Sequence, residues 1–397
     1  MRLPEAAIKA AILRPEEEVR VTAASYFSKS FSQDEAIMPL VVQCVEKYGR
    51  STALRILRDS QRLPQTQATV DWLVNELRRD YDLEDLDDDN YRFAVALILY
   101  QARPELLLER HKEIAALSMF PDPLRGPLDE RLDMLSWDWD RGWAALQAHG
   151  RDTMRRGSFT HNEVRYAHRI IESLARHRAA KAGFVFDLLQ PRDEGRSEPL
   201  MRWLEPLIVN LAGVMRLESA VPPLIKRLSA EDVRVSDQSA TALIRIDTDV
   251  AVHAIADEWR DADSDFRGAA SDVLEHVHTD LCAESCLRFF AVERDAVTRL
   301  SLAHAVLSQL IEEGVEPVRQ LVLGDGGEVT PNGLDIRYRL VVACTMMGVL
   351  FPEYAKWHED ALANHWGLGD YVPPRLADDF RPDRPEPKTS GDGKRPR

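Results

Sequence analysis

The stretch that decides the fold is residues 19–27, which read Val-Arg-Val-Thr-Ala-Ala-Ser-Tyr-Phe. A β-branched residue and an arginine are followed by two variable residues, two small residues, one variable residue and two apolar residues. Small residues in the middle of a helix allow a second helix to approach closely, and the flanking apolar residues fill the contact between the two. The pattern therefore predicts a short helix that packs against another helix.

The same nine-residue pattern returns along the chain. Copies begin at residues 91, 266 and 336, a copy at 235 lacks the arginine, and a degenerate copy covers 298–306. A spacing of about thirty residues between neighbouring copies indicates an array of similar helical units. We expect the recurring arginines to hydrogen-bond to backbone carbonyls or carboxylates of the adjacent unit, which is a structural role. These arginines are Arg20, Arg92, Arg267 and Arg337.

Helical periodicity dominates the rest of the chain. Apolar residues recur at three- and four-residue spacing, and no convincing alternation of the kind found in strands is present. Segments of this kind lie at 39–48, 69–77, 91–100, 221–228 and 251–259. Short helices with short connections favour antiparallel neighbours. The sequence therefore predicts an all-α protein in which antiparallel helical pairs stack into an α-solenoid, or superhelix.

One pair of predicted helices carries a resemblance to a known family. Residues 220–228 read Ala-Val-Pro-Pro-Leu-Ile-Lys-Arg-Leu, and a second predicted helix follows at 231–246. This pairing resembles a HEAT repeat, and the short spacing is most similar to the phycobilisome-lyase-type HEAT-like repeats of bacteria. The resemblance is good at 4–60 and 200–345 and weaker at 105–200. It implies an armadillo-like superhelix with a protein-binding surface, and it does not imply lyase activity.

The pattern divides the chain into five parts. HEAT-like repeats are expected at 1–119 and 200–350, an irregular helical segment at 120–199, and a capping helix with an extension at 351–378. Residues 120–127 are rich in proline and are predicted to form a boundary or a bent connection. Residues 324–333 are predicted to form a loop inserted within one helical pair. The tail at 379–397 has almost no apolar residue to bury and is predicted to be disordered.

Composition limits the classes of partner. The chain of 397 residues carries a net charge of −15, which opposes uniform binding to nucleic acids or anionic membranes. No apolar stretch is long enough to cross a bilayer, and the N-terminus lacks the apolar core of a signal peptide. We therefore expect a cytoplasmic protein with reduced and mostly buried cysteines. They are Cys44, Cys282, Cys286 and Cys344.

Two clusters contain residue types that bind metals, but neither has the spacing of a metal site. His276 and His278 precede Cys282 and Cys286, but the spacing matches no zinc motif, so the two thiols are predicted to face a helix contact. The acidic run at 80–89 lacks the glycine and the glutamate of a calcium loop. It is predicted to be an exposed loop whose end caps a helix that begins near Tyr91.

An aromatic cluster permits two interpretations. Trp137-Asp138-Trp139-Asp140 and Trp143 superficially resemble the groove of HEAT-like alkylpurine DNA glycosylases, which is lined by Trp and Asp. Helical spacing from Trp139 to Trp143 is equally typical of packing at a domain joint. The acidic net charge opposes binding to duplex DNA, so packing is favoured.

The segment 151–181 is basic within an acidic protein. Arg165, Arg169 and Arg176 fall near one side of a predicted helix whose other side is apolar. An ordinary solvated helix face explains this pattern, because charged faces are common. The functional alternative is a patch that binds an anion or an anionic partner.

No enzyme motif is present, so the sequence predicts no catalytic, cofactor-binding or metal-binding residue and no enzyme. The favoured function is a non-catalytic scaffold or adaptor that binds a protein or peptide on the concave face of the solenoid. The first alternative is a HEAT protein that binds nucleic acid through 151–181. The second is a HEAT-like DNA glycosylase.

Overall fold

The computed structural model describes residues 2–157, 160–190, 199–324 and 336–363. This part of the chain is all-helical, with 22 α-helices and several short 3-10 turns. It contains no β-strand beyond one isolated bridge between Arg2 and Ile311. None of these helices is long and apolar enough to cross a membrane.

The helices follow one another in short pieces. The N-terminal part contains α1 (Glu5–Ala11), α2 (Glu17–Lys29), α3 (Ile37–Tyr48), η1 (Arg50–Thr52), α4 (Leu54–Asp59), α5 (Gln67–Glu76), α6 (Leu86–Gln101), α7 (Pro104–Leu108) and α8 (His111–Ala116). The middle part contains α9 (Asp122–Asp133), η2 (Met134–Ser136), α10 (Trp139–Arg156), α11 (His161–Ala175) and α12 (Arg178–Leu188).

The C-terminal part is a second run of short helices. It contains α13 (Pro199–Val214), η4 (Glu218–Ala220), α14 (Val221–Ile225), α15 (Val233–Ile246), α16 (Asp249–Glu258), α17 (Ser264–His276), α18 (Asp280–Val292), α19 (Ala296–Ser308), η5 (Glu312–Gly314), α20 (Val315–Leu323), α21 (Ile336–Met347) and α22 (Tyr354–Ala363).

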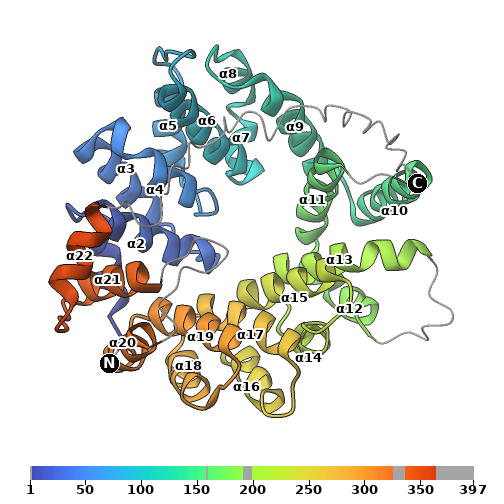
Figure 1. The fold of residues 1–397 in the computed structure, drawn as a ribbon. Helices are drawn as coiled ribbons and strands as arrows, with labels where there is room; N and C mark the ends of the chain where they lie inside the picture. The colour runs from blue at the N-terminus through green and yellow to red at the C-terminus, as the bar shows by residue number, and fades with distance from the viewer. Residues whose placement is uncertain (1, 158–159, 191–198, 325–335, 364–397) are drawn as a thin grey trace, which may run out of the picture.

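Alternate helices pack side by side and form the inner layer of a ring (Figure 1). In order around the ring this layer consists of α2, α4, α6, α9, α11, α13, α15, α17, α19 and α21. The outer layer includes α3 packed on α5, and α14, α16 and α18 packed in turn on one another. Each helix of the inner layer therefore has a neighbour on both sides.

The two ends of the described chain meet and close the ring. Helix α21 packs against α2. The Arg14 guanidinium donates a hydrogen bond to the carbonyl of Thr345 at 2.9 Å, and the Leu3 amide donates one to the carbonyl of Leu310 at 2.9 Å. Because these bonds join segments at opposite ends of the sequence, the first and last helices of the inner layer support each other.

Small residues set the spacing within the inner layer. Ala24 of α2 is fully buried. In α13, a Cβ atom added to Gly213 would lie 2.6 Å from Cα of Ala242 in α15, far inside van der Waals contact. The close approach of α13 and α15 therefore depends on the absence of a side chain at 213 and on a methyl group at 242.

The recurring arginines lie at the starts of inner helices, where they reach backbone carbonyls. Arg20 donates to the carbonyls of Arg14 and Pro15 at 3.0 and 2.6 Å. Arg267 donates to the carbonyl at the end of α16, that of Trp259, at 3.2 Å. Backbone carbonyls at helix ends lack partners within the helix, so the arginines stabilise the preceding turn.

The two other recurring arginines differ in their surroundings. Arg92 bonds to the Asp89 carboxylate and donates to the Met119 carbonyl at 2.9 Å, so it joins α6 to the segment before α9. Arg337 is partly buried near the start of α21. In the copy that lacks an arginine, the hydroxyl of Ser236 takes over the contact and donates to the Leu228 carbonyl at 2.6 Å.

Two sequence expectations need correction. The helix expected near Tyr91 begins five residues earlier, because the Asp85 carboxylate accepts hydrogen bonds from the amides of Asp87 and Asp88 and caps α6. The stretch 120–127, expected as a bent connection, is largely the start of α9. Pro123 lies in its first turn, where no amide donor is needed, and Leu124 and Leu128 bury its apolar face.

Three predicted features lie wholly or mostly outside the described residues. They are the tail 379–397, the extension beyond 363 and most of the 324–333 loop.

Candidate ligand pocket on the inner layer

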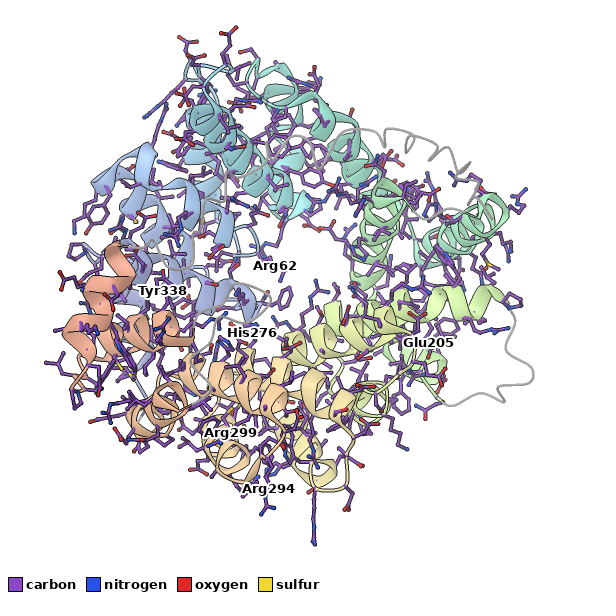
Figure 2. All side chains as sticks on the ribbon, viewed as in Figure 1. Arg62, Glu205, His276, Arg294, Arg299 and Tyr338 are labelled. Atoms are coloured by element: carbon purple, nitrogen blue, oxygen red, sulfur yellow. The ribbon has the colours of Figure 1, made fainter. Side chains whose placement is uncertain are left out.

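A cavity of about 210 Å³ lies where the ring closes. Its walls come from five inner helices, α2, α4, α17, α19 and α21, so it exists only because the two ends of the chain meet. A single water needs about 10–15 Å³ of such volume, so the cavity has room for a side chain or a small ligand. In Figure 2, the labelled residues Tyr338 and His276 mark two of its walls.

An ion pair lies in the cavity wall. The Arg339 guanidinium of α21 donates to the Glu275 carboxylate of α17 at 2.6 Å, and Ser308 of α19 lies 3.4 Å from the same carboxylate. Burial opposes ionisation of Glu275, but Arg339 outweighs it and the pKa of Glu275 falls to about 2. Glu275 therefore stays charged and is satisfied by the protein itself.

Three histidines near the ion pair are held neutral. Burial lowers the pKa of His276 to about 4 and that of His278 to about 3. It also lowers the pKa of His304 to about 4, and the charge of Arg339 adds to this effect. The His278 ring stacks on Tyr26 with 3.7 Å between ring centroids. At neutral pH the wall thus presents uncharged imidazoles.

The opposite wall adds charges of both signs. Arg55 of α4 lies 3.3 Å from the Glu17 carboxylate, and Lys29 is exposed at the end of α2. Burial raises the pKa of Asp59, although Lys29 and Arg55 oppose that rise. Apolar side chains lie between these groups, among them Val21, Leu307 and Val342. The cavity wall thus combines hydrogen-bond donors, acceptors and apolar surface.

The three basic residues expected to form an anion patch are distributed differently. Arg169 donates to the Glu130 carboxylate at 2.5 Å and is mostly buried, and Arg176 lies 3.2 Å from the Glu105 carboxylate. Arg165 is half-buried on the same helix, α11. Two of the three positive charges are therefore paired with carboxylates of neighbouring helices.

The aromatic cluster packs around α10, which lies on the outer side of the ring (Figure 1). The rings of Trp139 and Trp143 stack with 6.0 Å between centroids, and both meet Phe184 of α12 edge to face. Asp138 caps α10 by accepting a hydrogen bond from the Arg141 amide at 2.8 Å. Asp138 and Trp139 thus start α10 and attach it to α12.

The cysteine pair on α18 lies in a helix contact. The thiols of Cys282 and Cys286 lie 3.3 and 3.7 Å from the carbonyl of Leu274, at the end of α17. All four cysteines are buried and free of disulfides. Across the described ranges, no group of three or more His, Cys, Asp or Glu side chains is placed to hold a metal ion.

Sequence reasoning missed most of the pocket. Glu275, Arg339 and Arg55 belong to no motif, and they meet only through ring closure. The sequence singles out His276 and His278 only as candidate metal ligands, and it gives no sign that they line a cavity. The one available signal was polarity at inner-helix positions, such as Asp59 and Lys29, and this signal does not distinguish a cavity from a solvated face.

No family model matches the chain, and no curated protein matches its sequence. Among solved structures, the crystal structure of an engineered protein from the Northeast Structural Genomics Consortium is similar at 13% identity, covering 87% of this chain and 99% of that chain. The TM-score of this comparison is 0.31, and a similarity at this level supports no statement about fold or function.

Proposed function

We propose that this chain is a non-catalytic scaffold of HEAT-like helical pairs that binds a protein or peptide on the inner layer of its ring. The HEAT-like assignment rests on the repeated pattern and on the alternation of inner and outer helices around the ring. The function rests on fold-level analogy together with one observation, the mixed polar and apolar cavity at the ring closure.

The cavity favours a side chain of a partner as its occupant. Its lining combines the paired Glu275 and Arg339 with neutral histidines and aliphatic groups, so little desolvation of unpaired charge accompanies binding. Exposed Lys29 at its edge and partly buried Arg55 offer donors to backbone carbonyls or carboxylates of an extended segment. This combination resembles the anchor pocket and polar rim of a peptide-binding surface.

Filling the cavity tests the proposal. Ser25 lines it from α2, so Ser25→Phe is expected to occupy the space while leaving the ring folded. The matched control is Ser229→Phe, at an exposed site outside the cavity. Affinity capture from the native host, followed by mass spectrometry, is expected to show partners retained by wild type and Ser229→Phe and lost by Ser25→Phe. Equal partner sets for all three proteins would contradict an inner-layer binding site.

Cross-linking adds a positional readout. Lys29 is exposed at the cavity edge, whereas Lys226 is exposed after α14 in the outer layer. If the partner binds as proposed, amine cross-links to captured protein form at Lys29 and not at Lys226. The reverse pattern would move the binding surface to the outer layer.

Nucleic acid is the alternative occupant, through the segment 151–181. The pairing of Arg169 with Glu130 and of Arg176 with Glu105 disfavours it. Substitution of Arg165, Arg169 and Arg176 by glutamine is expected to leave partner capture unchanged across a salt series. Nucleic acid retained by wild type and lost by this triple variant would overturn the scaffold proposal.

A further inference from the structure

Three arginines meet around one phenylalanine where the N-terminal and C-terminal parts of the ring approach each other. The guanidinium carbon of Arg62 lies 4.9 Å from the centroid of the Phe31 ring, and that of Arg245 lies 4.4 Å from it. Arg216 donates a hydrogen bond to the Phe31 carbonyl at 2.5 Å. We call these residues the arginine cluster.

The cluster is assembled from segments far apart in the sequence. Phe31 follows α2, Arg62 follows α4, Arg216 follows α13, and Arg245 lies in the last turn of α15. All four of these helices, α2, α4, α13 and α15, belong to the inner layer. In Figure 2, Arg62 projects toward the middle of the ring.

Phe31 and Arg216 of the arginine cluster have an unusual backbone conformation. Phe31 and Arg216 have φ angles of 52° and 49°, in the left-handed region that favours glycine. A bulky side chain there carries a conformational cost. Phe31 and Arg216 are also the two residues joined by the hydrogen bond between the Arg216 side chain and the Phe31 backbone.

The positive charges of the cluster lack carboxylate partners. Within the described ranges, none of Arg62, Arg216 and Arg245 lies within 4.0 Å of an acidic group, although most arginines of this acidic protein do form such pairs elsewhere, as Arg319 does with Glu353 at 2.6 Å. The Arg245 guanidinium has only the Asn210 side-chain oxygen, at 3.5 Å. The cluster is therefore a local concentration of positive charge without a close ion pair, and the nearest offsetting carboxylate that acts on it is Asp247, beyond 4.0 Å from Arg216.

Arg245 is the member of the cluster that the other two positive charges affect. The pKa of Arg245 falls to about 10 because burial disfavours its charge and because Arg62 and Arg216 face it. Burial also lowers the pKa of Arg216, where the charge of Asp247 opposes the fall and that of Arg178 adds to it. A bound anion would relieve this repulsion.

We propose that Arg62, Arg216 and Arg245 form a binding site for one oxyanion of the phosphate class, carried by a small molecule or by a single phosphorylated residue. Guanidinium groups bind phosphate oxygens through paired hydrogen bonds, and three of them match a dianion better than a single carboxylate. A compact cluster in a chain of net charge −15 does not suit the repeated charges of a nucleic-acid backbone. The site is independent of the scaffold proposal, because its residues do not line the cavity at the ring closure.

The test is calorimetric titration of the full chain with inorganic phosphate and with pyrophosphate at low ionic strength. Wild type is expected to bind one pyrophosphate per chain. The variant with Arg62, Arg216 and Arg245 changed to glutamine is expected to bind at least tenfold more weakly. Arg62→Gln alone provides a second variant, since Arg62 is exposed and its loss leaves the fold intact. The matched control changes three exposed arginines away from the cluster, Arg202, Arg260 and Arg294, to glutamine.

The outcomes separate the sources of the oxyanion. Binding of a short phosphoserine peptide, but not of its unphosphorylated form, would support the site and assign it to a modified residue. Binding of free phosphate or pyrophosphate alone would support it and assign it to a small molecule. The proposal is overturned if wild type shows no saturable binding or if the control variant loses binding to the same extent. It is also overturned if a single-stranded oligonucleotide binds far more tightly than pyrophosphate with a steep salt dependence.

Discussion

At position 24 the contact between inner helices leaves no room for a larger side chain. Ala24 is fully buried in α2. Ala24→Leu adds three carbon atoms to a filled contact, so the free energy of unfolding is expected to fall by about 1–3 kcal/mol. Urea denaturation measures the change. The control Ala116→Leu, at an exposed position in α8, is expected to stay within about 0.5 kcal/mol of wild type. An unchanged stability for Ala24→Leu would mean that the repeat contact tolerates bulk.

The buried histidines make stability depend on pH. His276, His278 and His304 have pKa values lowered to about 4, 3 and 4, whereas an unfolded histidine titrates near about 6.5. Between these values the unfolded chain binds more protons than the folded chain, so stability is lost as pH falls from about 6.5 toward 4. Asp272, whose pKa is raised to about 6 by burial and by Glu275, acts in the opposite direction.

The free energy of unfolding is expected to change by about 1–3 kcal/mol per pH unit over this range. Each extra proton that the unfolded chain binds contributes about 1.4 kcal/mol per pH unit. Urea denaturation at several pH values measures it. His304→Leu removes one of the three histidine protons and is expected to flatten the slope by about a half below pH 6, because Asp272 offsets one of the three there. His253→Leu, at an exposed histidine, serves as control. A slope that His304→Leu leaves unaltered would mean that His304 is protonated in the folded protein.

The roles of single residues were only partly readable from the sequence. The recurrence of Arg20 and Arg267 at one place in the pattern predicted contacts with carbonyls or carboxylates of the adjacent unit. Arg267 reaches the Trp259 carbonyl and the Glu293 carboxylate, whereas Arg20 bonds to carbonyls of the turn before its own helix. Arg62 and Arg245 offered no comparable signal. Their positions depend on distant segments, so no local pattern distinguishes them from solvated arginines.

At the scale of elements, the contact between α13 and α15 rests on a missing side chain. A Cβ atom at Gly213 would lie 2.7 Å from the Cβ of Ala242 as well as against its backbone. Gly213→Ala is expected to destabilise by about 1–3 kcal/mol, since the two helices must separate. Ala242→Gly in the same chain removes one of the two clashes, so the double variant is expected to recover part of the loss, as coupled neighbours do. Thermal unfolding of the four proteins measures the coupling. Additive losses would mean that the helices shift freely.

Helices were more predictable than their ends. The segments 39–48 and 251–259 fall on α3 and α16 to within two residues at each end, because apolar periodicity fixes which residues face the core. The start of α6 was misplaced because the cap at Asp85 lies within a run of acidic residues where every position resembles a loop. The start of α9 was missed because Pro123 lies in the first turn, where a proline is harmless, and because α9 continues through a second proline, Pro127, in its interior.

At the scale of the whole molecule, an all-helical chain of short packed helices could be predicted, but the closure of the ring could not. A contact between helices that follow each other closely in the chain is local and leaves a periodic trace in the sequence. Closure depends on the small rotation from each repeat to the next, summed around the ring, and no single residue encodes that sum. The cavity lies where the ends of the described chain meet, and the arginine cluster joins Phe31 to the distant helices α13 and α15, so both were out of reach of local patterns.

Closure has a consequence for dynamics that distinguishes the ring from a linear array. The terminal repeats of an open array have one neighbour and fray first. Here α2 packs against α21 as well as α4, so the amides of α2 and α21 are expected to exchange hydrogen as slowly as those of α13 and α15. Hydrogen–deuterium exchange with mass spectrometry measures this directly. Fast exchange in α2 and α21 together with protection in α13 and α15 would show that the ring is open in solution.

A single substitution locates the effect at the closure. Arg14→Gln removes the hydrogen bond from the segment after α1 to the partly buried Thr345 carbonyl, together with the local ion pair to Glu16. A lost charged hydrogen bond of about 1.5–3 kcal/mol corresponds to exchange at least tenfold faster in α2 and α21 if these helices open as a unit. Arg78→Gln removes an exposed ion pair with Glu113 away from the closure and is expected to change neither helix. Because only a closed ring couples the two ends, acceleration in both α2 and α21 from one change at residue 14 requires their contact in solution.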